Sequence, residues 1–112
     1  MTWEITQDDR AGWQRQAAAE LAAILDDCAG LPCIAWTVGP AGAVLAGRVN
    51  GLAPAAQVRE TFSAWRAALA LDEVTETPSG NGTAVYLHAR AMRNGVAVSV
   101  TATVFPGAEV TA

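Results

Sequence analysis

The sequence predicts an α+β fold: a two-layer sandwich of a five-stranded, mainly antiparallel sheet and two helices, in the order α-β-β-α-β-β-β. Three observations support this prediction. Two segments carry apolar residues at helical spacing, and two others alternate apolar and polar residues around a glycine-containing turn. Most connections between the strands are short, which favours antiparallel pairing. Each apolar helix stripe needs a surface to cover, and one face of a sheet provides it.

The first helix is expected to begin after Thr6. Thr6 and Asp9 have the spacing of a capping box, in which each side chain accepts a hydrogen bond from the other residue's backbone N–H. The helix is expected to end near Cys28, because Gly30 and Pro32 do not continue a helix. Its apolar stripe consists of Trp13, Ala17, Leu21, Ile24, Leu25 and Cys28.

A first hairpin is expected where residues 33–38 and 43–49 flank a Gly-Pro-Ala-Gly turn. Proline presets φ at the second turn position, and glycine tolerates a positive φ at the fourth. A register that places Arg48 on the polar side with Thr37 is favoured, because the alternative buries Arg48 beside Trp36. In this register the facing pairs are Trp36 with Leu45 and Ile34 with Gly47.

The second helix is expected from Pro54 to about Leu69, since proline suits the first turn of a helix. The apolar stripe of this helix is Val58, Phe62, Trp65 and Leu69.

Residues 74–77 are expected to form a weaker strand that is poor in apolar side chains, which indicates an edge position in the sheet.

A second hairpin over residues 83–105 is the strongest local prediction, because Asn94-Gly95 is a favoured two-residue hairpin turn. The turn places Arg93 opposite Val96. The apolar face then pairs Ala91 with Val98, Ala89 with Val100, Leu87 with Ala102 and Val85 with Val104. The other face pairs Met92 with Ala97, Arg90 with Ser99, His88 with Thr101 and Tyr86 with Thr103. The residues expected to be almost fully buried in one core are Trp36, Phe62, Trp65, Leu87, Val98 and Val100.

Length and composition predict one domain over residues 1–112, with a short arm at 1–5 and a frayed tail at 106–112. The net charge is −4 and all seven cations are arginine, which argues against a nucleic-acid partner. No run is apolar enough for a membrane span, and the N-terminus has no signal-peptide pattern, so a cytoplasmic location is expected. Cys28 and Cys33 are expected to be free thiols, with a disulfide as the alternative.

Two resemblances accompany these observations. The arginine-only, alanine-rich composition, with segments such as LPCIAWTVGPAG and RNGVAVSVTATVF, looks like that of short uncharacterised proteins of high-G+C Gram-positive bacteria. The element order resembles the roadblock/profilin-like scaffold fold, which has a further terminal helix. That resemblance implies a small dimeric platform for GTPases or motor subunits, and it assigns no functional residue in this chain.

The outer face of the second hairpin holds the candidate site. A Tyr-x-His-x-Arg row beside Ser and Thr side chains suits an anion, a polar small molecule or a protein partner, and it also places His88 as a base near Thr101. The same residue types suit any solvated strand face. The candidate binding residues are Tyr86, His88, Arg90, Arg48, Thr101 and Thr103.

Catalytic motifs are scarce. One histidine excludes a two-histidine metal site, and the chain has no P-loop, G-x-G-x-x-G or G-x-S-x-G pattern. We therefore predict a non-enzymatic module, with no metal or cofactor, that binds an unidentified protein or associates with itself as a homodimeric scaffold or regulator. The alternative is a small-ligand-binding domain or minor enzyme that uses the face around Tyr86, His88 and Arg90.

Overall fold

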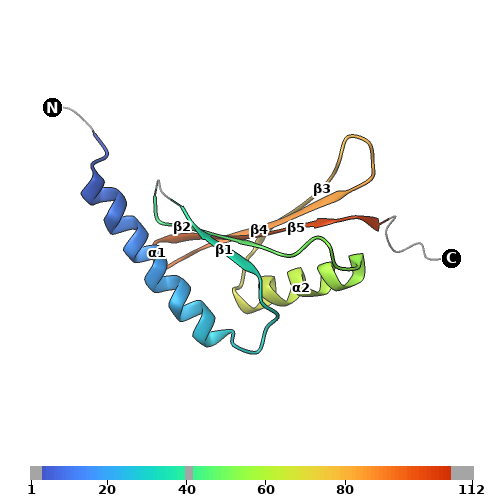
Figure 1. Ribbon diagram of the computed structural model, residues 1–112, viewed down its shortest axis with the longest axis horizontal. Helices are drawn as coiled ribbons and strands as arrows, with labels where there is room; N and C mark the ends of the chain where they lie inside the picture. The colour runs from blue at the N-terminus through green and yellow to red at the C-terminus, as the bar shows by residue number, and fades with distance from the viewer. Residues whose placement is uncertain (1–3, 40–41, 107–112) are drawn as a thin grey trace.

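The computed structural model describes residues 4–39 and 42–106, and it has the predicted order of elements (Figure 1). Pro40 and Ala41 of the predicted turn, residues 1–3 of the predicted arm and residues 107–112 of the predicted tail lie outside the described residues. The elements are α1 (Gln7–Asp27), β1 (Ala35–Val38), β2 (Val44–Arg48), α2 (Ala55–Ala68), β3 (Glu73–Pro78), β4 (Val85–Arg93) and β5 (Val96–Val104).

The five strands form one mixed sheet in the order β1-β2-β5-β4-β3. Three of its four strand pairs are antiparallel, as expected, but β2 and β5 are parallel. The parallel pair arises because α2 carries the chain across the sheet from β2 to β3, and the β4 and β5 strands then fold back between them. The predicted edge strand is correct, since β3 lies at one end of the sheet.

Both helices cover the same face of the sheet (Figure 1). α2 packs along β5, whereas α1 packs on β1, β2 and the β5 end near the hairpin turn. The predicted stripe of α2 is confirmed, because its four residues are all at least 95% buried against the core. Five of the six expected core residues are likewise buried, and they are Phe62, Trp65, Leu87, Val98 and Val100.

The predicted stripe of α1 is mostly correct, because Ala17 and Ile24 are buried and Leu21 and Cys28 pack against the core. The Thr6–Asp9 capping box is present, but Leu25 is 49% exposed and Glu20 is buried instead. Glu20 lies three residues after Ala17 and four before Ile24, so all three side chains point toward the sheet. The prediction did not include Glu20, because a carboxylate is seldom buried unless it has a partner.

The β4–β5 hairpin has the predicted register throughout, with Arg93 opposite Val96 and Val85 opposite Val104. Asn94 and Gly95 both have positive φ, at 50° and 80°. This is the backbone of a two-residue turn whose twist matches that of the flanking strands. The hairpin therefore folds as its local sequence dictates.

The register of the β1–β2 hairpin was predicted wrongly by two residues. Trp36 faces Gly47, not Leu45, and Val38 faces Leu45. The face assignment is correct, since Thr37 and Arg48 lie on the surface opposite the helices. Gly47 is the physical reason for the observed register, because only a residue without a side chain leaves room for the Trp36 ring. Trp36 itself is half-buried, since it lies on an edge strand.

Polar side chains join α1 to the β4–β5 turn, and we call them the α1–turn cluster: Gln16, Glu20, Arg93 and Asn94. The Nδ2 atom of Asn94 donates to Oε1 of Glu20 at 2.7 Å. The Nε2 atom of Gln16 donates to the Asn94 carbonyl oxygen at 3.2 Å. Nε of Arg93 lies 3.7 Å from the same Glu20 oxygen. A buried carboxylate thus holds the turn against the helix.

The two cysteines are both free thiols in the structure. Cys28 follows the last turn of α1 and is half-buried, whereas Cys33 is exposed in the segment that leads into β1. No helix within residues 4–39 and 42–106 combines the length and the apolar character that crossing a membrane requires.

Candidate functional site

Among residues 4–39 and 42–106, no helix lies on the sheet surface opposite α1 and α2, and we call this surface the open face. Strand alternation places all six candidate binding residues on it, from β2, β4 and β5. The strand pairing brings them together although Arg48 lies about half the chain away from the others in sequence. Tyr86, Arg90 and Arg48 are exposed, whereas His88, Thr101 and Thr103 are half-buried.

One row of the open face runs across four strands through Arg48, Thr101, His88 and Thr75. Neighbours in such a row have Cβ atoms about 4.5–5.5 Å apart. The row therefore juxtaposes a guanidinium, two hydroxyl groups and an imidazole. It exists because β2 pairs with β5, which the sequence did not predict.

Arg90 forms an ion pair with Glu73. Its Nε atom donates to a carboxylate oxygen of Glu73 across the β3–β4 ladder, where the two residues face each other. Both side chains are 65% exposed, so water screens the pair. Because Glu73 compensates its charge, Arg90 is a weaker anion ligand than its place in the Tyr-x-His-x-Arg row indicates.

His88 has no orienting partner among the described residues. Its ring makes no hydrogen bond there, and the Thr101 hydroxyl donates to the Gly47 carbonyl at 3.4 Å. A general base needs a hydrogen-bond partner that holds its ring and a proton within reach. Within the same part of the chain, no three His, Cys, Asp or Glu side chains gather as a metal site. The geometry gives His88 no catalytic support.

Two half-open hollows flank His88 on the open face. One, of about 550 Å³, is lined by Arg48, Tyr86, Thr101 and Thr103 and is bounded by Leu52 and Phe105. The other, of about 570 Å³, is lined by residues of the opposite half of the face, among them Arg90, Met92, Ser99 and Val44. His88 is half-buried and lines both hollows.

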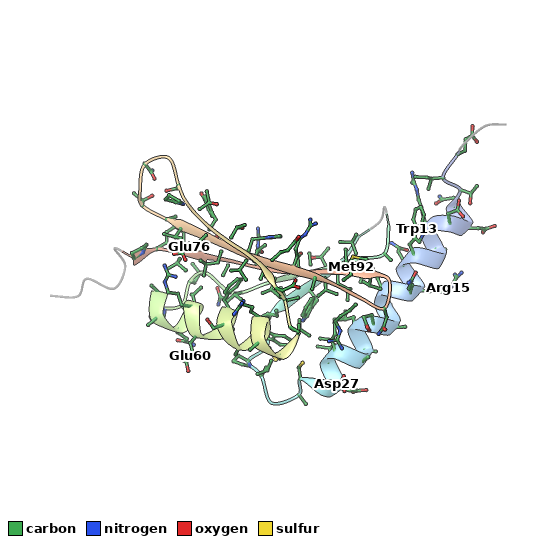
Figure 2. All side chains as sticks on the ribbon, turned by 180° about the vertical axis from the view of Figure 1, so that it is seen from behind. Trp13, Arg15, Asp27, Glu60, Glu76 and Met92 are labelled. Carbon is green, nitrogen blue, oxygen red and sulfur yellow. The ribbon has the colours of Figure 1, made fainter. Side chains whose placement is uncertain are left out.

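Large apolar side chains at the rim were not among the predicted site residues. Met92 is 67% exposed and Leu52 is 94% exposed, and Phe105 is 43% exposed. Figure 2 shows Met92 on the sheet, away from Glu60 on the outer side of α2. The hairpin alternation already places Met92 on this face, so its exposure was open to prediction. Leu52 carries no such signal, because it lies in the irregular loop after β2.

A comparison with known proteins found no family model, no curated protein and no solved structure that matches this chain.

Proposed function

We propose that this chain is a small, non-enzymatic protein-binding module, and that the open face is its docking surface. The observation that carries the proposal is the placement of both helices on one face of the sheet, with no helix of the described residues on the other face (Figure 1). A two-layer fold of this kind presents its free sheet surface to whatever binds it. A cytoplasmic location remains part of the proposal.

The size of the open face favours a protein over a small molecule. Five strands, each about 4.8 Å wide and up to nine residues long at about 3.3 Å a residue, cover at most about 700 Å². A standard interface takes about 800 Å² from each partner. A small-molecule site, in contrast, surrounds about 70–90% of its ligand. The hollows beside His88 are too open to do so.

The residue types on the open face also favour a protein partner. Exposed Tyr86, Met92 and Arg48 are of the kinds that interfaces contain more often than the rest of a protein surface. Small side chains on β2 and β5 belong to the same face, and they are Ala46, Ala97 and Ser99. A partner can therefore approach the sheet closely, while the larger residues at the rim fit its surface.

One observation favours the alternative of a small ligand. The row from Arg48 through Thr101 to His88 lines the 550 Å³ hollow, which is within the size range of ligand pockets. Arg48 has no ion pair within residues 4–39 and 42–106. An anionic ligand that includes an aromatic group would suit Arg48 and Tyr86 there.

Photo-crosslinking in the native host tests the proposal. A photo-crosslinking residue at position 92 should give a defined protein adduct, because Met92 lies on the open face and is exposed. The matched control is position 60, because Glu60 lies on the outer side of α2 (Figure 2). Adducts formed equally from both positions, or from position 60 alone, would contradict the proposal.

The identity of the adduct separates the classes of partner. A single heterologous protein at position 92 defines a scaffold or regulator with an external partner. A dimer of this chain defines self-association through the open face. If neither forms, and a titration with a small aromatic acid shifts the NMR signals of His88 and Thr101, the alternative function replaces the proposed one.

A further inference from the structure

Asparagine followed by glycine occurs three times in this chain, at positions 50–51, 81–82 and 94–95. An asparagine loses its side-chain amide when the backbone nitrogen of the next residue attacks Cγ. Glycine favours this attack, because it has no Cβ and its backbone rotates most freely. All three pairs therefore have the local chemistry for spontaneous deamidation, and their hydrogen bonds distinguish them.

Asn50 and Asn81 use their side chains as acceptors. Oδ1 of Asn50 accepts from the backbone N–H of Leu52 at 3.0 Å. Oδ1 of Asn81 accepts from the backbone N–H of Thr83 at 3.1 Å and from its hydroxyl at 2.7 Å. An aspartate at either position would keep an oxygen where these donors need one. Conversion to aspartate there would leave the turns intact.

Asn94 uses its side chain as a donor. Nδ2 lies 2.7 Å from one carboxylate oxygen of Glu20 and 3.4 Å from the other. Glu20 is only 6% exposed, so this bond is its main compensation, with Nε of Arg93 at 3.7 Å. A charged acceptor makes the bond stronger than one between neutral groups.

We propose that Asn94 is the deamidation site that matters in this protein, and that Glu20 protects it in the folded chain. In the reaction, the Gly95 nitrogen loses its proton and bonds to Cγ of Asn94. The Cγ–Nδ2 bond breaks, and ammonia leaves with that proton. Water then adds to the cyclic imide and opens it at either carbonyl, which gives aspartate or isoaspartate.

The folded state opposes the first step. Ring closure brings Cγ of Asn94 toward the Gly95 nitrogen, which requires the side chain to turn away from Glu20. The Gln16 bond to the Asn94 carbonyl also holds the peptide that would have to move. The hairpin turn itself fixes both residues at positive φ. The reaction therefore proceeds when the α1–turn cluster opens.

The product cannot reform the cluster. A carboxylate at position 94 has no N–H to donate, and it faces the buried Glu20 carboxylate at hydrogen-bond distance. Like charges at this separation repel, and a buried charge that loses its partner is destabilising. Conversion of Asn94 to aspartate would thus loosen α1 from the β4–β5 hairpin, whereas the same conversion at Asn50 or Asn81 would keep the local hydrogen bonds.

Reaction rates test the protective role of Glu20. The chain is incubated at mildly alkaline pH, folded and in denaturant, and each asparagine is followed by peptide mass spectrometry. In the folded chain, conversion at Asn94 should be about tenfold slower than in denaturant, the factor expected for a hydrogen bond to a charged group. Glu20→Ala should speed conversion at Asn94 and leave Asn81 unchanged. Equal rates at Asn94 in both states, or no effect of Glu20→Ala, would overturn the protective role.

Stability measurements test the consequence of the product. Asn94→Asp should lower the Tm by about 4–8 °C or more, whereas the matched control Asn81→Asp should leave it unchanged. The double variant Glu20→Gln with Asn94→Asp should regain part of the loss, because glutamine can donate to the new carboxylate. Equal Tm values for Asn94→Asp and Asn81→Asp would refute the destabilisation by the product. A Tm of the double variant no higher than that of Asn94→Asp would also refute it.

Discussion

Gly47 lies directly opposite Trp36 in the β1–β2 ladder, and the Trp36 ring fills the space above it. A Cβ atom at position 47 would lie 3.1 Å from two carbons of that ring and 2.8 Å from Cδ1 of Ile34. The valine side chain in Gly47→Val would collide with the ring. The expected loss of unfolding free energy is about 1–3 kcal/mol, as for other overpacked cores. Denaturant titration measures it.

Two further variants serve as controls: a smaller substitution at position 47, and a second substitution that makes room for the valine. Gly47→Ala should cost less than Gly47→Val, because the Ile34 methyl group at the end of a flexible side chain can move aside. Gly47→Val combined with Trp36→Leu should cost less than the sum of the two single changes. Strict additivity would show that Gly47 does not accommodate Trp36.

Trp65 is expected to be the most costly side chain to truncate. It is 2% exposed, its Nε1 atom donates to the Pro32 carbonyl at 2.8 Å, and its ring meets Trp36 edge-on with centroids 5.6 Å apart. Trp65→Ala should lower the free energy of unfolding by about 3–5 kcal/mol. This is a large part of the total for a domain, which is about 5–15 kcal/mol. Trp65→Phe should cost less, since it keeps a buried ring. An unchanged Tm for Trp65→Ala contradicts the packing described above.

The two thiols should differ in reactivity but not in oxidation state. Protein purified without oxidant and alkylated without reduction should gain two adducts, because Cys28 and Cys33 are both free. Cys33 should react first, since it is exposed and Cys28 is half-buried. Mass spectrometry at successive times gives both rates. Absence of adducts, with a mass lower by two hydrogens, would instead reveal a disulfide.

The open face should tolerate substitution without unfolding. A combined Tyr86→Ala, His88→Ala and Arg90→Ala variant loses mainly cross-strand contacts, each worth about 0.2–1 kcal/mol, and one screened ion pair. Circular dichroism should show a folded protein with a modestly lower Tm. The crosslink from position 92 should disappear.

Arg59→Ala is the matched control for that variant. It removes the other ion pair of β3, with Glu76 at 3.0 Å, which joins the strand to α2 instead of the open face. It should keep the crosslink from position 92. Unfolding of the triple variant would mean that the open face belongs to the core.

The second hairpin was predictable because Asn94-Gly95 specifies both a turn and a register, and the apolar alternation agrees with that register. The first hairpin was not, because its register was inferred from an assumed loop length. The missing side chain of Gly47 favours its place opposite Trp36, and the pattern of apolar residues in the sequence does not reveal this.

The candidate site was predictable within one hairpin and not beyond it. Alternation alone places Tyr86, His88 and Arg90 on one face. Whether Arg48 joins them depends on which strand pairs with β2, and local sequence carries no information about pairing between distant segments. The buried Glu20 was missed for the same reason, because its partner Asn94 lies 74 residues away in sequence.

The parallel pairing of β2 with β5 also determines when this sheet can assemble. β5 is the middle strand, yet it is the last of the five to be synthesised. While the chain is being made, the β1–β2 hairpin therefore has no neighbour, and α1 has no complete surface to cover. Contacts between segments so far apart form slowly, since a long loop must close first. A ribosome that pauses before Val96 would hold a chain that has four of the five strands but lacks β5, the middle strand of the sheet.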